Sequence, residues 1–186
     1  MPETIAETAE TRDDWKRCVA FHGHTCPGLA IGYRVALAAQ KRLQTEFSPD
    51  EEIVCVTEND ACGVDAVQVL TGCSFGKGNL IYRDTGKHAF SFYSRKDGRK
   101  IRIVFKMQGK RGNQADRDAF QKKILSASDE ELFAFTEPVD LPPSKARIFN
   151  SIACEECGEM APEHKIRLHE GRKLCLGCFP DYSRGW

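Results

Sequence analysis

The residues best suited to chemistry lie in one short stretch near the N-terminus. Positions 21–28 are Phe-His-Gly-His-Thr-Cys-Pro-Gly, so two imidazoles (His22, His24) and one thiol (Cys26) fall close together. Late transition metals prefer imidazole and thiolate ligands, and both groups also serve in acid–base or nucleophilic catalysis. Residues two apart point to different sides of a helix but to one side of an extended segment. His22 and His24 can therefore share a ligand only where the chain is not helical, and Gly23 makes a bend between them easy.

The thiol of this stretch stands where a helix is expected to begin. Pro27 suits a first helical turn because its φ is fixed and its missing N–H would have no partner there. Cys26 then lies at or beside the N-cap, where the helix dipole favours a thiolate. Cys62 is expected in the first turn of a second helix that begins near Asp60. Asp65, one turn later, is placed to donate a carboxylate or to orient an imidazole.

These side chains form the candidate functional site. We expect His22 or His24, together with Cys62, to hold a transition metal, and Cys26 to be a further ligand or a nucleophile. The candidate catalytic residues are Cys26, Cys62 and His24. Mixed nitrogen and sulfur ligation suits Zn, Ni or Fe more than Mg or Ca. A thiol redox protein that uses Cys26 with Cys62, or Cys62 with Cys73, is an alternative.

The loop after Cys73 offers a weaker signal. It contains Lys77 between glycines, and the ammonium and the glycine amides could hold an anion there. The loop matches no phosphate-binding fingerprint.

The last four cysteines predict a structural zinc site. They form two Cys-x2-Cys pairs with seventeen residues between the pairs, which is a spacing typical of zinc modules. The four ligands are Cys154, Cys157, Cys175 and Cys178. Residues 165–173 are expected to form a hairpin, as in a treble clef or zinc ribbon, with His169 as a minor alternative ligand. Because protein atoms fill all four positions, such a site has no open position for chemistry.

Basic residues give this tail a local positive charge. They are Arg147, Lys165, Arg167, Arg172, Lys173 and Arg184. Contact with RNA or DNA is compatible with this charge, but few aromatic residues are interleaved for base stacking. A solvated surface or contact with a protein partner are the other interpretations.

Composition limits the class of protein. The 27 Lys and Arg residues balance the 27 Asp and Glu residues, so no global basic field favours nucleic acid. Residues 1–10 are polar and acidic, unlike a signal peptide. No apolar run approaches the ~18 residues of a membrane span. Nine cysteines without a signal peptide argue against a disulfide framework. We therefore expect a cytoplasmic protein with no membrane partner.

The periodicity of apolar residues predicts an α+β fold, with a mostly antiparallel sheet and helices packed on one face. Helices are expected over 11–21, 27–43, 61–70, 113–126 and 129–135, and strands over 52–57, 80–83, 88–95 and 100–107. Gly28, Gly32 and Ala36 recur every four residues and form a ridge against which another backbone can pack closely. Prolines mark a linker, which gives a core domain over 1–136, a linker over 137–151 and a zinc-finger domain over 152–186.

Two motifs resemble the FmdE family, the E-type subunits of formylmethanofuran dehydrogenase. The first is residues 21–29 followed by Gly-Tyr-Arg at 32–34, and the second is residues 60–66 followed by Thr-Gly-Cys at 71–73 and Gly-Lys-Gly-Asn-Leu at 76–80. The resemblance covers roughly residues 15–135. It implies an α+β core that forms intertwined homodimers, a C-terminal zinc finger in some members, and a metal-binding or active-site cleft at the His/Cys motif.

The resemblance also bears on function. The parent complex uses a molybdenum or tungsten pterin in the reductive fixation of carbon dioxide, but its E-type subunit is not the catalytic subunit. We therefore expect a metal-binding accessory protein or a metal-dependent enzyme in one-carbon or molybdopterin-linked metabolism. The alternative is a zinc-finger regulator or adaptor that senses metal or redox state and contacts protein or nucleic acid.

Overall fold

The computed structural model describes residues 12–107 and 112–180. These form two compact units, with the boundary between Ala146 and Arg147. No helix among the described residues is both long and apolar enough to cross a membrane. The expectation that residues 1–10 are not a signal peptide concerns a segment outside the described residues.

The first unit contains a five-stranded mixed sheet. Its strands are β1 (Ile53–Thr57), β2 (Leu80–Tyr82), β3 (Ala89–Ser94), β4 (Lys100–Phe105) and β5 (Phe133–Thr136), in the spatial order β2-β1-β3-β4-β5. Only β1 and β2 run parallel, because a helix crosses over between them, and every other pair is antiparallel. This confirms the predicted α+β class with a mostly antiparallel sheet.

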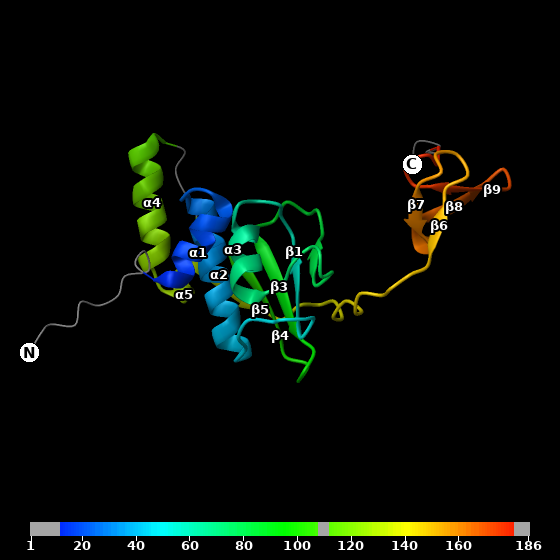
Figure 1. Cartoon of the computed structure of the whole chain (residues 1–186). Helices are drawn as coiled ribbons and strands as arrows, with labels where there is room; N and C mark the ends of the chain where they lie inside the picture. The colour runs from blue at the N-terminus through cyan, green and yellow to red at the C-terminus, as the bar shows by residue number, and fades with distance from the viewer. Residues whose placement is uncertain (1–11, 108–111, 181–186) are drawn as a thin grey trace, which may run out of the picture. The chain divides into compact units, whose positions relative to one another are not determined.

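The helices pack on one face of this sheet (Figure 1). They are α1 (Asp13–His22), α2 (Pro27–Leu43), α3 (Gly63–Thr71), α4 (Gln114–Ser126) and α5 (Asp129–Leu132). The bounds predicted for α2 are those observed, and its apolar residues Leu29, Tyr33 and Val35 are fully buried. The other helices and the antiparallel strands therefore surround a central α2.

The ridge of small residues on α2 brings its backbone against α3. A Cβ atom built on Gly32 would lie 1.9 Å from the carbonyl oxygen of Gly63, and one built on Gly63 would lie 2.9 Å from the carbonyl oxygen of Gly28. Side chains other than hydrogen would separate the helices at these positions. The ridge thus serves contact within the core, between the two helices whose N-termini carry Cys26 and Cys62.

Two predicted elements differ from the structure. The helix expected over 61–70 begins at Gly63 with Cys62 as its N-cap residue, because the Asn59 side chain accepts a hydrogen bond from the Ala61 amide and so holds a turn before the helix. The helix expected over 129–135 ends at Leu132, and the next four residues form β5. Pairing with β4 overrides local helix propensity there.

The first part of the predicted linker contacts the first unit. The amide of Ala146 donates to the Glu51 carboxylate at 3.1 Å, and the Lys100 ammonium donates to the Pro138 carbonyl at 3.3 Å. Pro138 to Asp140 also lie beside Val56 and Tyr93 on the sheet face that the helices leave open. This segment therefore covers part of that face.

The second unit is built from two small antiparallel sheets. One pairs β6 (Ser151–Ala153) with β7 (Met160–Pro162), and the other pairs β8 (Ile166–His169) with β9 (Arg172–Cys175) after the short 3-10 helix η1 (Glu163–Lys165). The β8–β9 pair is the hairpin expected between the cysteine pairs. This arrangement is consistent with the predicted zinc ribbon, while a terminal helix beyond residue 180 would lie outside the described residues.

The Gly32→Ala substitution tests the α2–α3 contact. Alanine favours a helix interior by about 1 kcal/mol over glycine, yet the clash with Gly63 requires the two helices to separate. We expect a net loss of about 2 kcal/mol or more in the free energy of unfolding, measured by urea denaturation. Gly76→Ala, where nothing lies within 4 Å of the new methyl group, is the control and should change stability little. Equal effects of both substitutions would contradict a special role for the contact.

Candidate functional site

The connection between α1 and α2 presents the candidate ligands. Helix α1 ends at His22, and Gly23 caps it with a left-handed backbone at φ 88°. Helix α2 starts at Pro27, and its N-cap residue Cys26 accepts a hydrogen bond through Sγ from the Leu29 amide at 3.3 Å. The predicted N-cap position of Cys26 is therefore confirmed. The non-helical turn lets His22 and His24 face the same side, as the spacing requires.

The ligand atoms of His22, His24 and Cys26 converge. One ligand atom from each residue lies within 4.8 Å of the others, and the two imidazole rings are 4.4 Å apart between centroids. His22 Nε2 and Cys26 Sγ are 3.8 Å apart. A tetrahedral zinc ion with ordinary Zn–N and Zn–S bonds separates such ligand atoms by about 3.6 Å. The donor set and its spacing thus fit a transition-metal ion.

Asp65 fixes the orientation of the His22 ring. The Nδ1 atom of His22 lies 2.7 Å from Oδ2 of Asp65, which α3 carries one turn after its start. Because Nδ1 faces the carboxylate, Nε2 is the atom that faces Cys26. Carboxylates orient metal-binding histidines in this way and increase the basicity of the ligand. The predicted interaction between Asp65 and an imidazole is present.

Cys62 lies beside this cluster but outside the group of three. A Cβ atom on Gly28 would lie 3.6 Å from Cys62 Sγ and 3.8 Å from Cys26 Sγ, so the absence of a side chain at Gly28 lets the two thiols approach. Burial raises the pKa of the Cys62 thiol, and the neighbouring Cys26 raises it further. The structure thus gathers His22, His24 and Cys26 most tightly, with Cys62 next to them.

A cavity opens next to the cluster. Its volume is about 440 Å³, within the range of small-molecule sites. His22, Cys62 and Asp65 line it together with Asp60, Phe75 and Tyr82. The candidate ligands are therefore accessible to a small molecule from this side.

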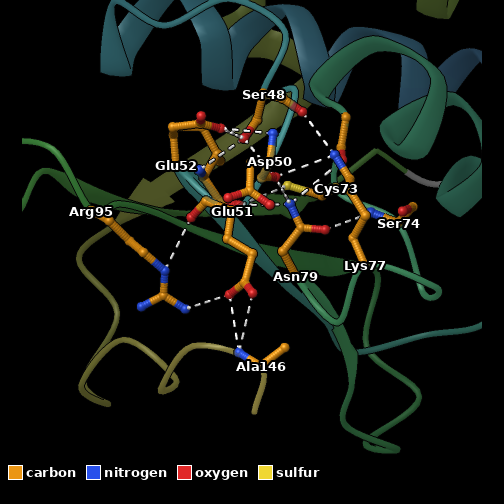
Figure 2. A network of polar contacts seen from close by, with 12 residues as sticks. Ser48, Asp50, Glu51, Glu52, Cys73, Ser74, Lys77, Asn79, Arg95 and Ala146 are labelled. Carbon is orange, nitrogen blue, oxygen red and sulfur yellow. Dashed lines mark hydrogen bonds and ion pairs between the residues drawn. The ribbon is translucent and has the colours of Figure 1, made fainter. Parts of the chain in front are cut away.

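Lys77 does not take part in the site. Its ammonium group donates to the carbonyl oxygens of Ser48, Pro49 and Asp50 at 2.8, 3.3 and 3.2 Å (Figure 2). These contacts hold the residue 74–78 loop against the segment that precedes β1. The expectation that Lys77 holds an anion is therefore wrong, because backbone carbonyls already occupy its donors.

Cys73 is also directed elsewhere. Its thiol is fully buried and donates to the Ile53 carbonyl at 3.5 Å, and burial raises its pKa to about 11. The buried Asn79, which sequence patterns do not single out, donates to the carbonyl oxygens of Asp50 and Ile53 and accepts from the Ser74 amide (Figure 2). Cys73 and Asn79 thus fasten the loop to β1.

The four tail cysteines form one cluster. Their sulfur atoms lie within 4.8 Å of one another; the residues are Cys154, Cys157, Cys175 and Cys178. Backbone N–H groups, first that of Cys157 and then that of Cys175, lower the pKa of Cys154 to about 6. The thiols of Cys157 and Cys175 raise the pKa of Cys178 to about 12. A divalent cation would relieve this mutual repulsion, which fits the predicted zinc site.

Comparison with known proteins agrees with both halves of this description. The family model described as "FmdE, Molybdenum formylmethanofuran dehydrogenase operon" matches residues 21–134. The chain belongs to the FmdE family. A second family model, the prokaryotic dksA/traR C4-type zinc finger, matches residues 147–184. The second unit of this FmdE protein is therefore a zinc finger with four cysteine ligands.

Individual relatives extend over much of the chain. An FmdE-like protein of tungsten formylmethanofuran dehydrogenase from Syntrophus aciditrophicus has a similar structure, with a TM-score of 0.61, 27% identity and 88% of each chain covered. A curated protein from Archaeoglobus fulgidus, described as a probable S-adenosyl-L-methionine-binding protein, is 31% identical over 199 residues. That match covers 89% of this chain, which spans about half the length of the curated relative.

Substitution of Asp65 tests the orientation of His22. Asp65→Asn removes the charged partner of Nδ1, so we expect metal affinity at the core to fall by about 10- to 100-fold. Competition with a fluorescent chelator measures this affinity. Asp118→Asn, at an exposed position on α4, is the control and should leave it unchanged. Equal affinities in the wild type and Asp65→Asn would show that the contact plays no part in metal binding.

Removal of the tail metal tests the zinc finger. EDTA treatment should release one zinc ion per chain and unfold the second unit, while the first unit keeps its melting temperature. Zinc affinity should fall as the pH is lowered, because the cysteines bind as thiolates. Metal analysis and amide NMR spectra report both effects. His169→Ala should retain the ion, and its loss in that variant would make His169 a ligand.

Proposed function

We propose that the FmdE core binds one transition-metal ion through His22, His24 and Cys26, with Cys62 as a fourth ligand or as a group beside an open coordination position. The convergence of the three ligand atoms within 4.8 Å carries this proposal. The Asp65 contact and the 3.8 Å distance between Nε2 and Sγ support it. Zinc, nickel and iron suit such a mixed set of ligands.

The surroundings of the cluster favour a reactive rather than a purely structural ion. His24 is exposed and the cavity reaches His22 and Cys62, whereas a structural zinc site is closed by four protein ligands. An ion with an open position acts as a Lewis acid or lowers the pKa of bound water. In that arrangement the chain orients His22 through Asp65 and admits a small molecule from the cavity.

The biological role proposed for this site is in one-carbon or molybdopterin-linked metabolism. The family description, which names the formylmethanofuran dehydrogenase operon, supports an accessory protein or a metal-dependent enzyme of that metabolism. We also propose that the chain acts in the cytoplasm as a homodimer, as the family resemblance implies. The experiment below addresses the metal, on which the other parts of the proposal depend.

Nucleophilic catalysis by Cys26 is the second candidate function. The same distances that suit a metal also place the thiol, imidazole and carboxylate in the order nucleophile, base and orienting group. The helix N-terminus at Cys26 favours its thiolate form. In this alternative, His22 takes the proton of the Cys26 thiol and Asp65 stabilises the resulting imidazolium.

The regulator interpretation has less support. Contacts within the second unit engage some of its basic residues: Arg172 pairs with Glu156, and Arg167 donates to the His164 carbonyl at 3.2 Å. Nucleic-acid contact by the finger therefore stays a prediction from charge alone.

Metal analysis of a variant without the finger site distinguishes the two core functions. In the full chain with Cys154→Ser and Cys157→Ser, we expect one transition-metal ion per chain to remain. Adding His22→Ala should remove it, whereas adding His88→Ala, at an exposed histidine outside the cluster, should not. Absence of the ion together with rapid alkylation of Cys26 would overturn the metal proposal in favour of nucleophilic catalysis.

A further inference from the structure

The cavity beside the cluster is acidic. Asp60 and Asp65 line it, and no lysine or arginine is among the described residues that do so. Lys77, on the neighbouring loop, is bound to three carbonyl groups outside the cavity. The one lining group able to gain a positive charge is His22, which already faces the Asp65 carboxylate. A ligand with phosphate or carboxylate groups would meet repulsion here.

A metal ion in the proposed core site would not reverse this charge. A divalent cation carries two positive charges, and Cys26 and Cys62 as thiolates carry two negative charges. The side chains of Asp60 and Asp65 then still give the site a net negative charge. The preference for a cationic ligand therefore holds with or without the ion.

Two aromatic residues stand at this cavity with much of their surface in solvent. Phe75 is 81% exposed and Tyr82 is 45% exposed, although they come from different segments, the loop after α3 and the end of β2. Electrostatic influence of Asp60 on Tyr82 places this carboxylate near the same ring. Exposed aromatic rings beside carboxylates form a surface suited to a flat cationic ligand, which gains from ring stacking and cation–π contact.

We propose that this cavity binds a small, flat aromatic ligand that carries a protonated amine and neither phosphate nor carboxylate. Its ring lies against Phe75 and Tyr82, its amine faces Asp60, and its opposite edge is directed toward Cys62 and His22. The inference deepens the proposed function by giving the class of ligand for the core site. It rests on that function only for the reaction that follows binding, because the charge and the aromatic rings are independent of the metal.

Matched probes test the proposed ligand class on the full-length, metal-loaded protein. Tryptamine has an aromatic ring and an amine, indole-3-acetate has the same ring and a carboxylate, and cyclohexylamine has an amine without an aromatic ring. We expect tryptamine to bind about tenfold tighter than either of the others. NMR titration measures the three dissociation constants. Similar affinities for tryptamine and cyclohexylamine would indicate amine coordination alone and overturn the proposal, as would tighter binding of indole-3-acetate or no binding of tryptamine.

Variants locate the binding. Phe75→Ala and Asp60→Asn should each weaken tryptamine binding about tenfold. Phe47→Ala removes another exposed phenylalanine, one that is not among the residues lining this cavity, and should have no effect. If Phe75→Ala instead changes only the oligomeric state, the ring forms a contact between protomers and the proposal is wrong.

Metal analysis of the same samples separates this inference from the proposed function. Preferential tryptamine binding by a core without a metal ion would support the ligand class and overturn the metal proposal. A core that holds its ion but does not distinguish the probes would have the opposite meaning.

Discussion

The contact between the backbones of α2 and α3 determines where the functional groups lie. Gly32 and Gly63 leave no room for side chains between the helices, and Gly28 gives Cys62 space beside Cys26. Two helix N-termini, each with a cysteine at the N-cap, are thereby held together. The small-residue ridge contributes to function mainly by this geometry, since glycines in a helix otherwise reduce its stability.

The second constraint joins the end of α1 to this pair of helices. Gly23 ends α1, so that His22 and His24 project from a turn rather than from successive helical positions. Asp65 of α3 then fixes the His22 ring against Cys26. The cluster therefore depends on three helices at once, and its geometry is set by packing in the core. The zinc finger differs, because its four ligands come from one short segment and the spacing alone specifies the site.

Local sequence signals were sufficient where a structure depends on neighbours in the chain. Pro27 and the apolar residues after it predicted the bounds of α2, and the cysteine spacing predicted the zinc finger. They failed where distant residues decide: Phe133 to Thr136 form a strand because β4 pairs with them, and Lys77 is held by carbonyl groups before β1. In the candidate site, the residue types were apparent from the sequence, but the closer association of Cys26 than of Cys62 with the histidines depends on the packing of α2 on α3.

Anomalous diffraction at a metal absorption edge, from crystals of the full chain grown without chelator, tests the core metal most directly. Two peaks per chain are expected, one among the four finger cysteines and one bounded by His22, His24 and Cys26, with Asp65 still paired to His22. A single peak at the finger, with well-ordered density and no peak at the His/Cys cluster, would contradict a metal role for the core.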